Sequence, residues 1–293
     1  MRNITVTMKK LYVSDLDGTL LNRESRLSVA TERMLQHLLM DGIDFTIATL
    51  RSISSVAPIF HNITLNLPII ELNGAFITDL NTGEKLEINA IDTTVCLPLY
   101  NALTESGVSP IILTHKDTAD KLCFREITNA GSEHYYTNRV MHEDPRVCTY
   151  TDASELTAHQ WVGVTVIEKP DILTGCRNKL ESMFHETVNV NLTESIQTPE
   201  FVWMTISSTE ATKAHAIKSL QERLGFQEHA VVSFGDQLID IPMFQISDLA
   251  IAVQNAPEEV KNAAGQVIGS HDADAVAKYL YADFYRSSQK PSP

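Results

Sequence analysis

The chain has 293 residues, of which 43% are hydrophobic and 20% are charged, a composition typical of a folded globular protein and unlike that of a disordered one. Its formal net charge of −14 disfavours nucleic acid and membrane surfaces as partners, because both carry negative charge, and the sequence indicates no protein partner. The four cysteines form no CxxC pair, and the short polar start of the chain lacks a signal peptide's apolar region, so we expect free thiols in a cytoplasmic protein.

Two aspartates follow the first strand that the sequence predicts. The apolar run that begins at Leu11 is short and gives way to Gly18, which suits a central strand followed by a turn. Asp15 and Asp17 then lie at the carboxyl end of the strand, where open α/β sheets bind ligands. A divalent cation such as Mg²⁺ would neutralise two crowded carboxylates, whereas a polar turn without chemical function explains the same residues. The spacing alone leaves both interpretations open.

The next elements alternate between helix and strand. Ser28 is a plausible N-cap for a helix over 29–40, and the apolar run 43–49 predicts a strand. A helix from Ser52 to about residue 60 and a third strand over 68–72 follow. This alternation predicts an α/β fold, a Rossmann-like doubly wound parallel sheet with helices on both faces.

The pattern changes after Asn73-Gly74, where residues 75–78 and 85–88 are expected to form a hairpin. Short strands and helices then mix, which indicates an α+β domain inserted at 85–198. Its expected strands cover 110–114, 121–125, 161–167 and 188–191, and its expected helices cover 93–106 and 171–185.

A second core-like region is expected to begin with a strand over 201–206, so that residues 1–84 and 199–293 together form one discontinuous α/β core. The expected strands that follow are 230–235 and 249–253, and the expected helices are 211–224, 239–245, 257–264 and 274–281. The polar segment 286–293 is expected to be a disordered tail.

Polar motifs follow four of these core elements. They are Asp15-Leu16-Asp17-Gly18-Thr19, Ala48-Thr49-Leu50-Arg51, Lys213, and Gly235-Asp236-Gln237-Leu238-Ile239-Asp240. Their order and spacing around an inserted domain resemble the haloacid dehalogenase superfamily, and more narrowly the Cof-type phosphatases with a type-IIB cap. Asn73-Gly74-Ala75 followed by a hairpin is similar to the start of that cap, and 251–261 is similar to the segment after the family's last acidic motif. The resemblance covers nearly the whole chain.

The resemblance implies a division of labour between the two aspartates of the first motif. Asp15 corresponds to a nucleophile that forms an aspartyl-phosphate, and Asp17 to a general acid and base. It also implies a Mg²⁺ cofactor, held by Asp15, the backbone carbonyl of Asp17, and Asp236.

The other matched positions have supporting roles in the resemblance. Lys213 supplies a fixed positive charge, Thr49 a hydroxyl for a phosphoryl oxygen, and Asp240 orients the metal site or Lys213. The expected substrate-binding residues are Arg51, Asn73, Gly74 and Asn255.

Each supporting residue also has a purely structural interpretation. Lys213 could be a solvated helix lysine, Thr49 a capping or sheet hydroxyl, and Asp240 a surface carboxylate near a helix start. Two positions depart from the family pattern. Leu50 stands where many members have glycine, and Ile239 stands where many have asparagine.

The expected function is therefore that of an enzyme, a Mg²⁺-dependent phosphoric monoester hydrolase acting on a small phosphorylated metabolite such as a sugar phosphate. One alternative is phosphomutase-type transfer, in which the aspartyl-phosphate returns its phosphoryl group to a sugar. The other is a catalytically weakened protein that binds phosphate and metal in a regulatory role.

Overall fold

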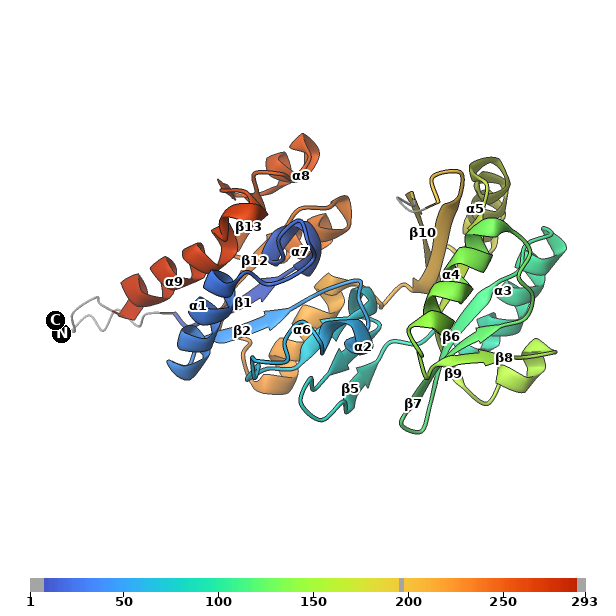
Figure 1. The fold of residues 1–293 in the computed structure, drawn as a ribbon, viewed down its shortest axis with the longest axis horizontal. Helices are drawn as coiled ribbons and strands as arrows, with labels where there is room; N and C mark the ends of the chain where they lie inside the picture. Colours follow the sequence, from blue (N-terminus) through green and yellow to red (C-terminus); the bar gives the residue numbers. More distant parts are fainter. Residues whose placement is uncertain (1–7, 195–197, 289–293) are drawn as a thin grey trace. The chain divides into compact units, whose positions relative to one another are not determined.

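The computed structural model describes residues 8–194 and 198–288, and within them the chain divides into two compact units. The first unit comprises residues 1–87 and 212–293, and the second comprises 88–211 (Figure 1). The expected polar start of the chain and the end of the expected tail, residues 289–293, lie outside the described residues.

The first unit contains a five-stranded sheet in the order β14-β13-β12-β1-β2, and all of its neighbouring strands are parallel. Parallel neighbours joined by helical connections confirm the doubly wound α/β fold that the sequence predicts. The strands are β1 (Lys10–Ser14), β2 (Asp44–Ile47), β12 (Ala230–Gly235), β13 (Leu249–Val253) and β14 (Gln266–Ile268).

Both faces of this sheet are buried, because successive residues of a strand point to opposite sides. In β1, Tyr12 belongs to the apolar core shared with α1 and α9, whereas Leu11 and Val13 belong to the core shared with α6, α7 and α8. The helices α1 and α9 come from opposite ends of the chain and lie side by side (Figure 1). The helices of the first unit are α1 (Val29–Met40), α2 (Ile53–Val56), α6 (Lys213–Leu224), α7 (Ile241–Gln245), α8 (Glu258–Ala263) and α9 (Ala275–Ser288).

A smaller three-stranded sheet extends the first unit beyond β2. It contains β3 (Ile69–Glu71), β4 (Phe76–Thr78) and β5 (Lys85–Ile88) in that order. A parallel bridge between Ala48 and Ile70 places β3 next to the end of β2. The loop after β2 is therefore supported by this small sheet.

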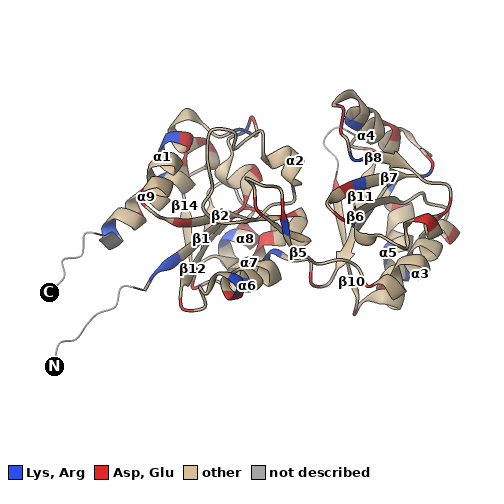
Figure 2. Ribbon diagram, turned by 90° about the horizontal axis from the view of Figure 1, so that it is seen from below, with Lys and Arg blue, Asp and Glu red and all other residues tan. Residues whose placement is uncertain are grey.

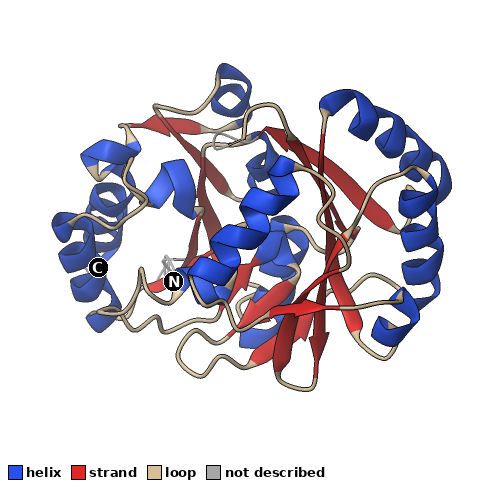
Figure 3. Ribbon diagram, turned by 45° about the vertical axis from the view of Figure 1, so that its right-hand side comes forward, coloured by secondary structure: helices blue, strands red, loops and turns tan. Residues whose placement is uncertain are grey.

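The second unit contains a six-stranded sheet in the order β10-β11-β9-β6-β7-β8, covered by helices (Figure 3). α3 and α5 pack on one face with Trp161 in the core between them, and α4 packs against the smaller cluster around Phe124 and Phe201. The strands are β6 (Ile111–Lys116), β7 (Ala119–Phe124), β8 (Val147–Thr149), β9 (Gln160–Glu168), β10 (Val188–Glu194) and β11 (Val202–Ser208), and the helices are α3 (Thr93–Glu105), α4 (Ala130–Met141) and α5 (Pro170–Phe184).

The structure corrects four expectations. The strand expected at 201–206 in the core is β11, which pairs with β10 and β9, so the chain returns to the first unit at Thr212 and not at 199. The helix expected from Ser52 to about residue 60 is only the short α2. Arg286, expected in a disordered tail, lies in α9. The elements α4, β8 and β14 were not predicted.

Within the described residues, none of the helices combines the length and apolar character needed to cross a membrane. Charged side chains occur on both units, and the 37 acidic residues of the chain outnumber its 23 lysines and arginines (Figure 2).

Candidate active site

The carboxyl ends of three neighbouring strands place the predicted site residues together. Ser14 of β1 pairs with Phe234 of β12 on one side and with Ile47 of β2 on the other. Asp15 directly follows β1, and its backbone N–H donates to the carbonyl of Phe234 at 2.9 Å. Asp236 directly follows β12. The parallel register thus brings residues more than 200 positions apart to one edge of the sheet.

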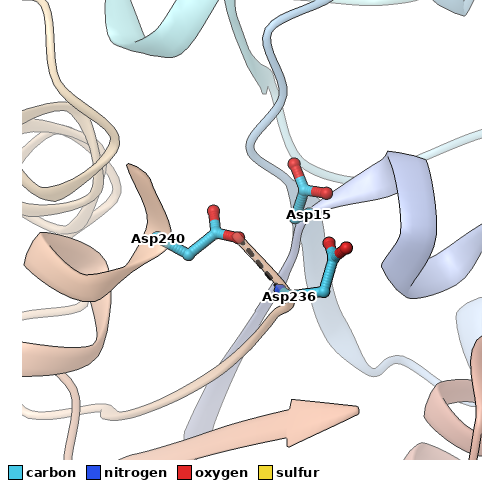
Figure 4. Close-up of side chains that lie close together, drawn as sticks. All are labelled: Asp15, Asp236 and Asp240. Carbon is cyan, nitrogen blue, oxygen red and sulfur yellow. Dashed lines mark hydrogen bonds between the residues drawn. The ribbon is translucent and has the colours of Figure 1, made fainter. Parts of the chain in front are cut away.

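Three carboxylates form the centre of the site. Asp15, Asp236 and Asp240 each offer an oxygen atom, and these atoms all lie within 4.8 Å of one another. Figure 4 shows the three side chains close together, with Asp15 after β1, Asp236 after β12, and Asp240 at the end of the short turn Leu238–Asp240 that follows. They are 7%, 4% and 0% exposed, so water does little to screen their mutual repulsion.

Lys213 is buried between two of these carboxylates. It begins α6, where Thr212 caps the helix by accepting a hydrogen bond from the backbone N–H of His215. Its Nζ donates to Oδ1 of Asp15 at 2.5 Å and to Oδ1 of Asp240 at 2.7 Å. With 2% exposure, Lys213 is not a solvated helix lysine.

Asp240 links this ammonium group to the acidic strand end. While one of its oxygens accepts from Lys213, Oδ2 accepts hydrogen bonds from the backbone N–H groups of Asp236 and Gln237, both at 3.0 Å. The dashed line in Figure 4 marks the hydrogen bond from Asp236. Because Asp240 is fully buried, it is not a surface carboxylate. It orders the turn that presents Asp236.

The buried charges shift the proton affinities of the site. Burial raises the pKa of Asp15 to about 7, with Lys213 opposing the rise and Asp240 and Asp236 adding to it. Burial also raises the pKa of Asp236. Burial alone would lower the pKa of Lys213, but Asp15 and Asp240 overcome this effect and raise it. Three carboxylates partnered by one ammonium group leave an excess of negative charge.

This excess fits a hard divalent cation. The available metal ligands are carboxylate oxygens, which Mg²⁺ prefers.

Two neutral side chains hold Asp236 in place. Oγ1 of Thr19 donates a hydrogen bond to its Oδ1 at 2.7 Å, and Nε2 of Gln237 donates to its Oδ2 at 3.0 Å. Gly18 has a φ of +76°, and a Cβ there would overlap the Asp236 carboxylate. Thr19 and Gln237 were not predicted as site residues, although both lie within the acidic motifs.

Asp17 lies apart from the acidic cluster. Its carboxylate accepts two hydrogen bonds from Arg51, from Nε to Oδ2 and from Nη2 to Oδ1, both at 2.6 Å. The Asp17 side chain is 48% exposed. Arg51 was expected to bind the substrate, but in the structure it contacts Asp17, the residue expected to act as acid and base. The two-point contact fixes the plane of the Asp17 carboxylate.

The loop after β2 holds Thr49 beside the site. Thr49 is 1% exposed, and its Oγ1 accepts a hydrogen bond from the backbone N–H of Arg51 at 3.1 Å. This contact closes a turn between Thr49 and Arg51 and does not cap a helix, because the N-cap residue of α2 is Ser52. The hydroxyl hydrogen of Thr49 is still able to donate. The backbone φ angle of Leu50 is not positive, so this position does not need a glycine. Leu50 is 54% exposed. The loop therefore accepts leucine in place of glycine.

The remaining expected binding residues support backbone segments. The backbone N–H of Asn73 donates to the carbonyl of Thr49 at 2.9 Å. Gly74 has a φ of +98°, and a Cβ there would overlap the backbone of Thr212, next to Lys213. Nδ2 of Asn255 donates to the carbonyl of Gly18 at 2.8 Å, and its Oδ1 accepts from the backbone N–H of His271 at 3.1 Å.

Glu71 stabilises the loop that carries Thr49, a role that the sequence did not predict. This fully buried carboxylate accepts hydrogen bonds from Lys85, from the hydroxyl of Thr78 at 2.6 Å, and from the backbone N–H of Ile53. Ile53 begins α2, so Glu71 fixes the end of the loop that carries Thr49 and Arg51.

Replacing Glu71 with glutamine is expected to lower the free energy of unfolding by about 1.5–3 kcal/mol, because the buried ion pair between Glu71 and Lys85 is lost. Urea denaturation of the full chain measures the loss. Glu84→Gln, at an exposed site in the same hairpin, is the matched control and should change the value by less than about 0.5 kcal/mol. Equal midpoints for the two variants would contradict the proposed support.

Known proteins resemble this chain along most of its length. Residues 12–280 match the family of haloacid dehalogenase-like hydrolases. The chain is 24% identical to 5-amino-6-(5-phospho-D-ribitylamino)uracil phosphatase of Bacillus subtilis, over 92% of this chain and 94% of the relative. It is also 24% identical to pyridoxal phosphate phosphatase of Escherichia coli, over 93% of this chain and 98% of the relative. A solved structure of a subclass IIB sugar phosphatase superposes with a TM-score of 0.70 and 20% identity, covering 95% of this chain and all of that one.

The chain therefore belongs to the haloacid dehalogenase-like hydrolase family. The family match and the relatives together identify it as a hydrolase of the phosphatase type, which confirms the class of enzyme that the sequence predicts.

Proposed function

We propose that the chain is a Mg²⁺-dependent phosphatase that hydrolyses a small phosphorylated metabolite through an aspartyl-phosphate at Asp15. The observation that carries the proposal is the buried arrangement of Asp15, Asp236, Asp240 and Lys213 at one strand edge. An attacking carboxylate and a phosphate dianion repel each other, so a phosphoryl-transfer site needs positive charge on both sides of the reacting group. Lys213 supplies the part of that charge that belongs to the chain.

Asp15 attacks phosphorus, and the leaving oxygen receives a proton as its bond to phosphorus breaks. Lys213 holds one oxygen of Asp15 and so limits its rotation, which keeps the attacking carboxylate in one orientation. Asp17 is the proposed donor of the proton and later the base that takes a proton from water. Through its two hydrogen bonds Arg51 orients the carboxylate of Asp17, which is the form that takes a proton from water.

The proposed ligands of Mg²⁺ are Asp15, the backbone carbonyl of Asp17, and Asp236, and Asp240 orients Asp236 and Lys213. A bound Mg²⁺ would neutralise the charge of the phosphoryl oxygens beside Asp15. General acid catalysis contributes about 10²- to 10⁴-fold, whereas phosphate-monoester hydrolysis is accelerated by enzymes up to ~10²¹-fold. Most of the acceleration must therefore come from positioning and electrostatics, which is what the charged residues of this site provide.

Phosphate release tests the proposal. The substrates are a hexose phosphate, pyridoxal phosphate, 5-amino-6-(5-phospho-D-ribitylamino)uracil and a generic aryl phosphate, each with Mg²⁺ and with a chelator. Mg²⁺-dependent release of inorganic phosphate supports a hydrolase. Formation of an isomeric hexose phosphate without free phosphate would indicate a mutase, and binding of metal and phosphate without turnover would indicate the regulatory alternative.

The affinity for Mg²⁺ is expected to rise about tenfold between about pH 6 and about pH 8, because the metal needs the carboxylate form of Asp15 and this group has a pKa of about 7 in the metal-free protein. Below this pKa Asp15 is mostly protonated and must lose its proton before Mg²⁺ binds. Above this pKa Asp15 is already a carboxylate. Calorimetric titration with Mg²⁺ at both pH values, in two buffers of different ionisation enthalpy, measures the affinity and the proton released.

Asp15→Asn is the control for this linkage, since asparagine cannot titrate, and its weaker Mg²⁺ affinity should be nearly independent of pH in this range. An affinity in the unaltered chain that is the same at both pH values, without proton release, would contradict the assigned competition.

A further inference from the structure

Two cysteines lie side by side in the second unit, outside the candidate active site. Cys123 in β7 and Cys148 in β8 are register partners in a parallel pair of strands. Neighbouring strands are about 4.8 Å apart, which lies within the range of Cα separations of ordinary disulfides. The two Sγ atoms are 2.7 Å apart, and both cysteines are free thiols. A bond between them therefore requires no rearrangement of the sheet.

The two thiols differ in their surroundings. Cys123 is 1% exposed, and burial together with the contact to Cys148 raises the pKa of its thiol to about 12. Cys148 is only half-buried, on the last strand of the sheet in the order β7-β8. A small oxidant in solution therefore reaches Cys148 before Cys123. The protonated thiol of Cys123 lies in contact with Cys148.

We propose that Cys123 and Cys148 are a modification site at which a hydroperoxide produces a reversible intrachain disulfide. The peroxide transfers one oxygen to the sulfur of Cys148, which becomes a sulfenic acid as the O–O bond breaks and water or an alcohol leaves. The sulfur of Cys123 then attacks that of Cys148, so that the S–S bond forms, the S–O bond breaks, and the thiol proton leaves with the hydroxyl group as water. Two thiols are oxidised, and one peroxide is reduced.

The bond would join positions 25 residues apart and enclose α4 in a closed loop. β8 has only three residues and lies at the edge of the sheet, where strands separate most readily. Closing this loop limits the freedom of the unfolded chain and fixes β8 to β7. The oxidised protein should thus unfold at a higher temperature than the reduced one, and a thiol reductant should reverse the shift.

Mass spectrometry of the full chain tests the proposal. The reduced protein is treated with hydrogen peroxide, its remaining thiols are alkylated under denaturing conditions, and its peptides are mapped without reduction. The expected product is lighter by about 2 Da before alkylation, carries a Cys123–Cys148 cross-link, and takes up alkyl groups only at Cys96 and Cys176. Cys148→Ser should prevent the cross-link, and Cys96→Ala, which removes a buried thiol of the same unit, should leave it intact.

Four alkylated cysteines after treatment would overturn the proposal, and so would oxidation of Cys148 to a sulfinic acid without a cross-link. Pairing of either cysteine with Cys96 or Cys176 would also overturn it. The mapping uses the unaltered chain, so its result does not depend on whether a variant folds.

Discussion

Asp15→Asn is expected to reduce the turnover number for an aryl phosphate by about 10³-fold or more, because the amide cannot serve as a nucleophile toward phosphorus. The substitution keeps the size of the side chain and an oxygen that accepts a hydrogen bond from Lys213, so the fold should persist. Steady-state kinetics with saturating Mg²⁺ measures the loss. When the substrate carries a labelled phosphoryl group and the reaction is quenched, the label should be found on the unaltered chain and not on Asp15→Asn.

Asp171→Asn is the matched control, since Asp171 is exposed at the start of α5 in the second unit. It removes the same charge from the chain and should keep full turnover. Retention of more than a few per cent of activity by Asp15→Asn, with an unchanged thermal midpoint, would rule out the nucleophilic role and leave the fold assignment untouched.

Local sequence was sufficient for the elements whose ends are marked by caps or turns. The expected helix 29–40 coincides with α1, where the side chain of Ser28 accepts a hydrogen bond from the backbone N–H of Thr31. The expected strands 230–235 and 249–253 coincide with β12 and β13, which are apolar along their length because both faces of the sheet are buried.

Sequence was not sufficient where partners from distant segments decide the structure. The β-rich segment around Met204 was correctly predicted as a strand, but which sheet it joins depends on pairing with β9 and β10. α4 is mostly polar and buries only Gly131 and Ser132 among its residues, so its apolar periodicity is weak. The side chain of Asn129, which caps its start together with Ser132, was the available signal.

The candidate site shows the same division. Asp15, Asp236 and Lys213 follow strands or begin a helix, so their convergence could be anticipated from the order of elements and from the family resemblance. The pairing of Arg51 with Asp17 could not be anticipated, because two flexible side chains on separate loops meet without any pattern in the sequence. Whether each of these residues has its assigned chemical role stays a prediction that the proposed variants test.

Lys213→Met is expected to lower the free energy of unfolding by about 3–5 kcal/mol at about pH 8, because Asp15 and Asp240 lose the buried cation that they share. The loss should be smaller at about pH 5.5. The pKa of Asp15 is raised in the folded state, so this group favours folding at low pH and its contribution disappears as the pH rises through about 7. Without Lys213, which opposes that rise, protonation of Asp15 at low pH relieves more of the repulsion.

Urea denaturation at both pH values, with a chelator present, measures the loss of stability. A loss caused by packing alone would be equal at the two pH values, whereas the electrostatic effect is larger at the higher pH. Lys218→Met is the matched control, since Lys218 is exposed on the same helix and its replacement should change stability by less than about 0.5 kcal/mol. Activity should also fall by at least about 10²-fold in Lys213→Met, because a fixed charge beside the reacting group is lost. A stable variant that keeps its turnover would contradict the proposed role of Lys213 as the fixed positive charge beside Asp15 and Asp240.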